Sequence, residues 1–309
     1  MQLLGCGITA SVILGGVEGG GTKWICAVGT GPDDLRAVET IPTTNPGETL
    51  GRVAAFFGAF PDVVAVGVGS FGPLDLDEAS PGYGSITTTP KEGWRGTNVR
   101  SVLASTLGLP VAIDTDVAAA ALGEGRFGAA QGAGTFCYIT IGTGIGGGAI
   151  VDGKIVHGLL HPEFGHMRIP HDSERDPFAG ACPYHGDCFE GLASGEALRR
   201  RYGVAAGLLD VEGAWELEAD YIALGLINIV CVLSPQRIVL GGGVSKAPGL
   251  LPLVRERLAL LAGGYFDSPA LHERIADYVV PPALGDHAGV IGALELARIA
   301  VSDELVTNP

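Results

Sequence analysis

The chain has 309 residues, of which 47% are hydrophobic and 17% are charged, a composition typical of a globular protein with a full core. Its formal net charge of −15 disfavours nucleic acid as a partner, because phosphates would be repelled, and disfavours a basic contact with a membrane surface. The six cysteines are too few to build a fold from disulfides.

The N-terminal residues 1–16 are apolar but lack the basic segment that begins a signal peptide. We interpret them as a short leader followed by a first strand. No run of 18 apolar residues is free of turn signals, so we expect no membrane span. A reducing, cytoplasmic location is the default for such a chain.

In the first third of the chain, strands are predicted over 12–17 and 24–29, separated by the turn 18-EGGGTK-23. Helical spacing predicts a helix over 48–60. Its candidate core positions are Phe56, Phe57 and Phe60. The elements predicted next are a buried strand over 63–71, a long loop over 72–97, a helix over 99–107 capped by Asn98, a strand over 111–116 and a helix that begins at 117.

A second series begins at 135 with a strand, a glycine turn and another strand, followed by a tight Asp152–Gly153 hairpin. It resembles the first hairpin, so we infer a weak internal duplication. A long loop then covers 157–190. The remaining predictions are helices over 194–202, 214–232, 248–263 and from about 287, with strands over 237–243 and 277–280.

The two glycine turns, 18-EGGGTK-23 and 142-GTGIGGG-148, suggest phosphate binding, because glycine lets backbone N–H groups wrap an anion. A P-loop is excluded because the lysine is displaced by one position. A dinucleotide fingerprint is excluded because a strand, not a helix, follows the first turn. The alternatives left open are two plain hairpins, or two turns that face each other and hold ATP phosphates with hydroxyls from Thr22 and Thr143.

Asp116 ends an apolar strand and precedes a helix, which places its side chain at the carboxyl edge of a sheet. A carboxylate there can accept the proton of a substrate hydroxyl and so assist its attack on a γ-phosphate. The alternative is that Asp114 or Asp116 only caps the helix, and for Asp114 the cap is the favoured interpretation.

The stretch 182-CPYHGDC-188 supplies three possible metal ligands, Cys182, His185 and Cys188. A mixed set of thiolates and imidazole favours a structural zinc, with a disulfide between the two cysteines as the alternative. A redox pair would prefer C-x-x-C, which is absent. The fourth ligand stays open among His157, His161, His166 and His171. Glu163 and Glu190 flank this loop.

These motifs together resemble the ROK family of sugar kinases, over about residues 13–300. The segments that carry the resemblance are 16-GVEGGGTK-23, 113-IDTDVAAAALGE-124, 140-TIGTGIGGG-148, 163-EFGH-166 and 182-CPYHGDCFEGLASG-195. Two segments are similar to the bacterial fructokinase branch of that family: the CPYHGDC form of the cluster, with His185 in place of a cysteine, and 84-GSITTTPKEGW-94.

The resemblance implies an α/β, actin/hexokinase-like (ribonuclease H-like) kinase fold with two lobes and a cleft between them. The small lobe would comprise residues 1–114, with a helix at about 290–309 returning to it. The large lobe would comprise residues 115–289 and include a zinc loop over 157–190. Family habit also implies a homodimer.

The resemblance also implies roles for individual residues. Asp116 falls on the catalytic base. The sugar ligands would be Glu163, His166 and Glu190. The zinc ligands would be His166, Cys182, His185 and Cys188. Positions implied to bind ATP, which would act with Mg²⁺, are Gly19, Gly20, Gly21, Thr22, Lys23, Gly142, Thr143, Gly144, Gly241, Gly242, Gly285, Asp286, His287, Ala288 and Gly289.

The implied activity is transfer of the γ-phosphoryl group of ATP to fructose. The alternatives are a glucokinase or mannokinase, or a sugar-binding protein without catalysis. A sugar-responsive repressor is disfavoured, because only about 15 residues precede the first glycine turn and the family's repressors carry a helix-turn-helix there. Two positions depart from the family pattern: Ala118 replaces a common asparagine, and Glu196 replaces a common proline.

Overall fold

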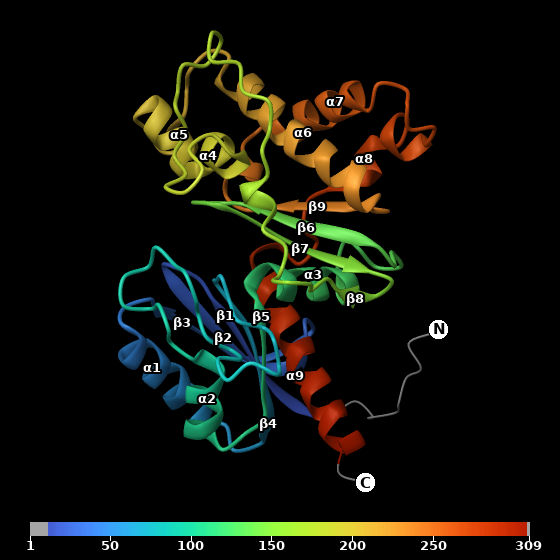
Figure 1. Ribbon diagram of the computed structural model, residues 1–309. Coiled ribbons are helices and arrows are strands. Elements are labelled where there is room, and N and C mark those ends of the chain that lie inside the picture. The colour runs from blue at the N-terminus through green and yellow to red at the C-terminus, as the bar shows by residue number, and fades with distance from the viewer. Residues whose placement is uncertain (1–11, 308–309) are drawn as a thin grey trace. The chain divides into compact units, whose positions relative to one another are not determined.

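The computed structural model describes residues 12–307, so the leader expected in 1–11 lies outside the described residues. The chain divides into two compact units (Figure 1). Unit 1 contains the described residues up to Gly128, the segment His157–His161 and the residues from Asp286 onward. Unit 2 contains Ala129–Val156 and Pro162–Gly285.

Unit 1 is built on a five-stranded sheet with the order β3-β2-β1-β4-β5. The first three strands pair antiparallel as a meander, whereas β4 and β5 run parallel to β1. The prediction of a first hairpin and two later strands is confirmed, while β3 was not predicted. The strands are β1 (Ile13–Gly19), β2 (Lys23–Gly31), β3 (Asp34–Pro42), β4 (Val63–Ser70) and β5 (Val111–Thr115).

Helices cover both faces of this sheet (Figure 1). Two consecutive glycines of β1 face opposite sides of the sheet. Gly15 packs against Phe57 of α1 on one side, and Gly16 packs against Leu294 of α9 on the other. Phe57 is buried as predicted, whereas Phe56 and Phe60 are only partly buried. The helices are α1 (Pro46–Gly58), α2 (Val99–Leu107), α3 (Asp116–Phe127) and α9 (Ala288–Thr307).

Helix α9 approaches its neighbours so closely that two contact positions admit only glycine. A β-carbon on Gly67 of β4 would collide with the carbonyl oxygen of Ala293, and one on Gly292 would collide with the carbonyl oxygen of Ala119 in α3. Helix α3 therefore packs with α9 in unit 1. Unit 1 runs on to Gly128, beyond residue 114, where the small lobe was expected to end.

Unit 2 repeats part of this plan, with a sheet of order β10-β9-β6-β7-β8. As in unit 1, its first three strands pair antiparallel, and a later strand, β9 here and β4 in unit 1, runs parallel to the first. The predicted Asp152–Gly153 turn is confirmed, with φ angles of 50° and 75°. The strands are β6 (Phe136–Ile141), β7 (Ile145–Val151), β8 (Lys154–Ile155), β9 (Ile238–Gly241) and β10 (Val279–Val280).

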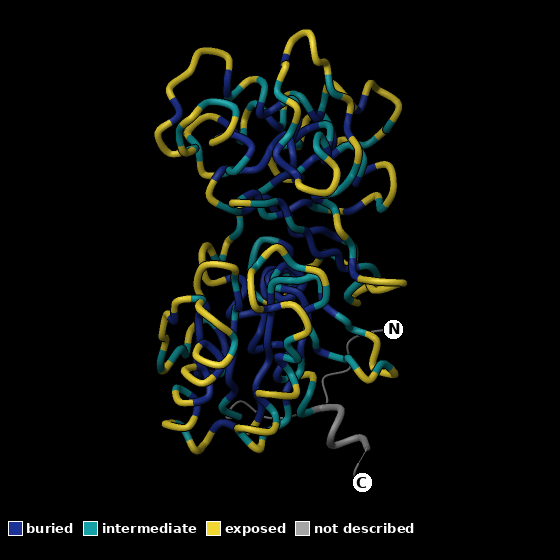
Figure 2. The backbone as a smooth tube through the Cα atoms, turned by 60° about the vertical axis from the view of Figure 1, so that its left-hand side comes forward, coloured by how far each residue is buried: buried dark blue, intermediate teal, exposed yellow. Residues whose placement is uncertain are grey.

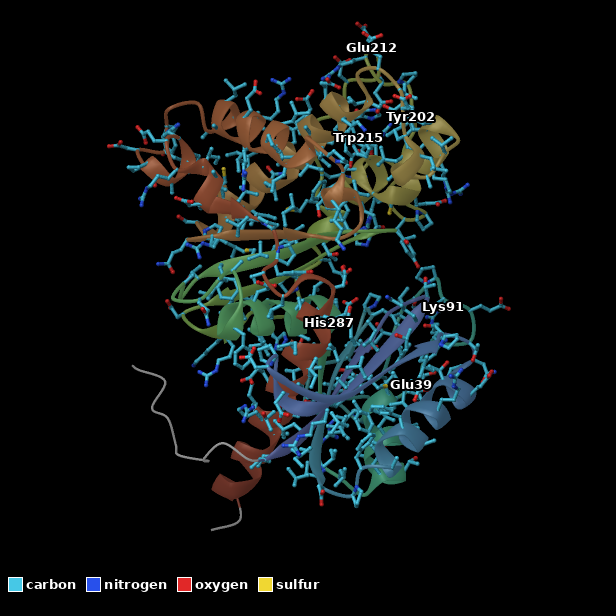
Figure 3. All side chains as sticks on the ribbon, turned by 180° about the vertical axis from the view of Figure 1, so that it is seen from behind. Glu39, Lys91, Tyr202, Glu212, Trp215 and His287 are labelled. Carbon is cyan, nitrogen blue, oxygen red and sulfur yellow. The ribbon has the colours of Figure 1, made fainter. Side chains whose placement is uncertain are left out.

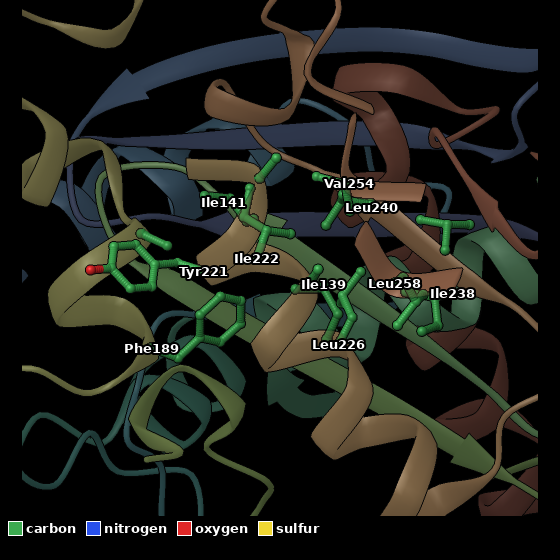
Figure 4. Close-up of a cluster of buried hydrophobic side chains, with 14 of the residues drawn as sticks. Ile139, Ile141, Phe189, Tyr221, Ile222, Leu226, Ile238, Leu240, Val254 and Leu258 are labelled. Atoms are coloured by element: carbon green, nitrogen blue, oxygen red, sulfur yellow. The ribbon is translucent and has the colours of Figure 1, made fainter. Parts of the chain in front are cut away.

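The core of unit 2 lies between this sheet and its helices (Figure 4). Ile139 and Ile141 of β6 contribute to it, as do Ile222 and Leu226 of α6. The chain is buried along these strands and helices and exposed mainly in the connecting loops (Figure 2). The helices are α4 (Phe189–Ala193), α5 (Gly195–Tyr202), α6 (Ala214–Leu233), α7 (Leu250–Ala262) and α8 (Ile275–Tyr278). Among residues 12–307, no helix has the length and apolarity needed to cross a bilayer.

The long loop over 72–97 is anchored by Trp94, whose side chain is fully buried. Its ring stacks on Trp24 with 5.4 Å between ring centroids, and its Nε1–H donates to the carbonyl oxygen of Thr44 at 2.8 Å. We expect Trp94→Ala to lower the free energy of unfolding by about 3–5 kcal/mol, because a large cavity and an unpaired carbonyl remain. Urea titration followed by circular dichroism would measure the loss. A change below about 1 kcal/mol would show that the loop does not depend on this anchor.

Candidate functional site

Three strands of unit 1 end at the same level of the sheet. Gly19 of β1 pairs with Ser70 of β4, and Ser70 pairs with Thr115 of β5. The residues that follow these strand ends, including Asp116, therefore lie together at the carboxyl edge, where open α/β sheets bind their ligands.

Two hydrogen bonds fix the turn between β1 and β2. The Gly20 N–H donates to the carbonyl oxygen of Lys23 at 2.9 Å, and the Thr43 hydroxyl donates to the carbonyl oxygen of Gly20 at 2.7 Å. Gly21, Thr22 and Lys23 are exposed, and no atom lies within 4 Å of the place where a β-carbon on Gly21 would stand. The tip of the turn is thus open to an anion.

Asp116 is the first residue of α3, and its Oδ1 accepts the N–H of Val117 at 2.9 Å. The helix cap is Thr115, whose hydroxyl accepts the N–H of Ala118 at 3.1 Å. The interpretation of Asp114 or Asp116 as the cap is therefore wrong. The shorter side chain of Thr115 accepts the free N–H of the first turn. The carboxylates of Asp114 and Asp116 are therefore available to other partners.

Burial raises the pKa of Asp116 to about 6, although the hydrogen bond from the Val117 N–H favours the ionised form. Glu18, on β1, has its pKa raised to about 7, mainly by burial and then by the charge of Asp116. The Glu18 carboxylate lies against the α-carbon of Gly289, and its Oε2 has no hydrogen-bond partner within the described part of the chain. Two neighbouring carboxyl groups with raised pKa values make this edge a candidate functional site.

Three of the histidines considered as metal ligands have other partners. His157 Nε2 lies 2.9 Å from Oδ2 of Asp114, and His161 Nε2 accepts the N–H of Leu74 at 3.0 Å, both within unit 1. His171 contacts the carbonyl oxygen of Asp176. Spacing in the sequence could not exclude these three histidines as ligands, because it does not show which of them the fold brings close to the cysteines.

The candidate metal-ligating group in unit 2 is His166, Cys182, His185 and Cys188, whose possible ligand atoms all lie within 4.8 Å of one another. The Nδ1 atoms of the two histidines are 3.3 Å apart. Nδ1 of His166 lies 3.7 Å from the Cys182 sulfur and 3.8 Å from the Cys188 sulfur. A tetrahedral zinc with its usual bond lengths separates its ligand atoms by roughly 3.3–3.8 Å. The four side chains therefore fit a zinc ion with no open position.

The backbone around this group is folded back on itself. Cys182 and Gly186 exchange two backbone hydrogen bonds, and Gly186 takes a φ of 64° that closes the turn between the cysteines. The Phe189 N–H donates to the carbonyl oxygen of Met167, which joins the cysteine loop to the short helix Phe164–His166. Ligands from two separate segments are thus brought together.

The second glycine turn adjoins this region. The Ile145 N–H donates to Oε2 of Glu190 at 2.9 Å, and Gly165 packs against the carbonyl oxygen of Ile145. Glu190 and the segment from Glu163 to His166 are thus both placed at the start of β7. The exposed Glu163 precedes the short helix and accepts the His166 N–H on its own carbonyl oxygen at 3.0 Å.

A cavity of about 500 Å³ opens beside the same turn, within unit 2. Gly142 and Thr143 line it, and they are fixed to α5 because they accept the N–H groups of Gly195 and Glu196. The family resemblance assigned Gly142 and Thr143, and the glycines at 241–243, to ATP binding. The full lining is Gly142, Thr143, Gly195, Glu196, Arg199, Ala205, Ala206, Gly207, Gly243 and Val244.

Glu196, which the sequence analysis noted as a departure from the family pattern, is part of this cavity wall. Its carboxylate accepts from Arg199 at 2.7 and 2.8 Å and from Arg200 at 2.6 Å. These hydrogen bonds lower its pKa to about 2, so the carboxylate stays ionised at any physiological pH.

Some residues expected near ATP do not line the cavity. Gly241 packs against the Tyr138 hydroxyl, and Gly242, with a φ of 93°, packs against the backbone of Ile141. Gly285 closes unit 2, whereas Asp286, His287 (Figure 3), Ala288 and Gly289 belong to unit 1, where Gly289 contacts Glu18. Gly241, Gly242 and Gly289 thus allow close packing of neighbouring atoms, whereas at Gly285, which has no such neighbour, the φ of 57° favours glycine.

The sequence profile of the ROK family matches residues 14–300. A fructokinase from Zymomonas mobilis is 47% identical over 297 residues, which cover 93% of this chain and 97% of that protein. A ROK hexokinase from Thermus thermophilus has a solved structure with a TM-score of 0.77 and 29% identity, covering 94% of this chain and 99% of that one. A ROK family glucokinase from Streptomyces griseus, solved with glucose and AMPPNP, has a TM-score of 0.74 and 28% identity, covering 93% and 99%.

Proposed function

This chain belongs to the ROK family, and from that premise we propose that it is a fructokinase, which transfers the γ-phosphoryl group of ATP to D-fructose. The observation that carries the proposal is 47% identity to a fructokinase over nearly the whole of both chains. The glucokinase solved with glucose shares only 28%. The α/β architecture is that of the actin/hexokinase-like fold, in agreement with the two solved relatives.

In this proposal Asp116 is the general base. Its carboxylate accepts the proton of the attacking sugar hydroxyl while the oxygen forms its bond to the γ-phosphorus and the bond to the β-phosphate oxygen breaks. A pKa of about 6 suits this role, since the group is ionised near neutral pH and still basic enough to take the proton.

The two glycine turns bind the phosphates through backbone N–H groups, with Lys23 and Thr143 at their exposed tips. Bound with the nucleotide, Mg²⁺ neutralises phosphate charge. Carboxylate oxygens are its preferred protein ligands, and Glu18, which lies near Asp116 at the edge of the unit 1 sheet, is a carboxylate that could hold it. The cavity beside Gly142 and Thr143 has a volume suited to the nucleoside part of ATP.

The sugar hydroxyls are bound by Glu163, His166 and Glu190. If His166 ligates a zinc ion through Nδ1, its ring is held in one orientation and Nε2 is left to contact the sugar. Because protein ligands fill all four positions, the zinc serves the fold of the loop and takes no part in bond making.

A homodimer, which the family resemblance implies, is also proposed, and the molar mass in solution would test it. A cytoplasmic location, the default expectation for this chain, would make ATP available as the phosphoryl donor.

The decisive experiment measures ATP-dependent phosphorylation of fructose, mannose and glucose by the purified protein with Mg²⁺. We expect the highest kcat/KM with fructose, because the overall likeness favours a fructokinase. A preference for glucose or mannose would keep the kinase assignment and replace the substrate. Binding of a sugar without turnover would instead identify a sugar-binding protein on a kinase fold.

A further inference from the structure

Residues 157–161, here called the histidine segment, pack on unit 1 although the residues before and after them belong to unit 2. Each end of the segment is held by an imidazole. His157 binds Asp114 in β5, and His161 binds the Leu74 N–H in the loop after β4 and lies against Gly72. Between them Leu159 and Leu160 are exposed, whereas the two histidines bind side-chain and backbone groups of unit 1.

The partner of His157 leads directly to the proposed base. Asp114 is buried, with Oδ2 facing His157 and Oδ1 accepting the N–H of Thr115 at 2.7 Å. Thr115 in turn caps α3, whose first residue is Asp116. A continuous set of hydrogen bonds therefore runs from the imidazole to the turn that presents the base.

We propose that His157 is a positioning residue for the phosphoryl transfer: by binding Asp114, it fixes the Asp114–Asp116 turn and thus the direction of the Asp116 carboxylate. This inference rests on the proposed function. Without His157, the buried carboxylate of Asp114 would turn toward another hydrogen-bond donor or take up a proton. Either change would move Thr115, whose N–H the carboxylate accepts. A shift of about 1 Å in a reacting group can lower turnover 100-fold.

The charge on His157 supports the arrangement. Its hydrogen bond with Asp114 raises the pKa of the imidazole, so a larger fraction is protonated near neutral pH than in a free histidine. The hydrogen bond persists in both protonation states, since Nε2–H can donate from the neutral ring as well.

The test compares His157→Phe, which keeps a ring and removes the donor, with His157→Gln, which places an amide N–H near the position of Nε2. We expect His157→Phe to lower kcat for fructose at least about tenfold while KM for fructose and for ATP changes less than about twofold. We expect His157→Gln to regain most of the lost kcat. Leu159→Ser, on the same segment, is the matched control and should keep full activity.

A His157→Phe variant with normal kcat would overturn the inference, as would a His157→Gln variant that is equally impaired. A loss of kcat matched by an equal loss in the Leu159→Ser control would also overturn it. Should His157→Phe not fold, Asp114→Asn makes the same test, since its amide keeps the acceptor for Thr115 and removes the carboxylate that His157 binds. A wild-type protein without any sugar kinase activity would refute the proposed function, and this inference with it.

Discussion

Asp116→Asn is expected to lower kcat for fructose phosphorylation by at least about 100-fold, in line with the contribution of a general base. The amide has the same shape and can still accept the N–H of Val117, so α3 should begin as before. It cannot take the proton of the sugar hydroxyl. Steady-state kinetics would measure the loss, and unchanged KM values and Tm would show that binding and folding persist.

The pH dependence of the wild-type protein provides an independent check on Asp116. Its pKa is raised to about 6, and the base must be ionised, so kcat should fall as pH decreases through that value, about tenfold for each further unit. Glu196→Gln is a suitable control, because that carboxylate has a pKa of about 2 and stays ionised across this range. Near-normal turnover in Asp116→Asn would refute the assignment of the base.

Removal of the proposed zinc ion is expected to have the second large effect. Cys182→Ser, or treatment with a chelator, should release zinc and weaken fructose binding at least about tenfold, because His166 loses the bond that orients its ring. Metal content by mass spectrometry and fructose affinity by calorimetry would measure both changes. The unit 2 region between 162 and 190 should also become sensitive to protease, while unit 1 stays resistant.

Cys231→Ser is the matched control for the metal experiment. Cys231 is an exposed cysteine of α6 in the same unit and lies outside the ligand group, so its loss should change neither zinc content nor fructose affinity. A metal-free protein that keeps its fructose affinity would show that the four ligands serve another purpose.

Much of the fold could be predicted where local chemistry and burial agree. The helix over 99–107 was predicted with its cap, because the Asn98 side chain accepts a backbone N–H of the first turn, as expected of that residue type. Strand β3 could not be predicted, since among its nine residues only Ile41 is buried and its exposed faces carry no clear alternation. The short helix α8 was missed because four residues carry no helical periodicity.

The candidate site was predicted where its residues are neighbours in sequence. The cysteine loop showed three candidate ligands of one metal group, and the family resemblance implied His166 as the fourth. Spacing alone could not select His166 over the other histidines, which the fold places beside Asp114, Leu74 and Asp176. The contact between Glu18 and Gly289 joins two ends of the chain, and no local pattern indicates it. The cavity wall formed by Ala205–Gly207 was missed for the same reason.

The packing of α9 has a consequence for how the protein is made. Gly16 and Gly67 of the unit 1 sheet, together with Gly123 of α3, are covered by helix α9, which follows unit 2 in the chain. Synthesis proceeds at roughly 5–20 residues per second, so this face of unit 1 stays uncovered for roughly 10–30 seconds while unit 2 is translated. The apolar face is exposed during that interval, and a nascent chain stalled before residue 288 should bind chaperones through it.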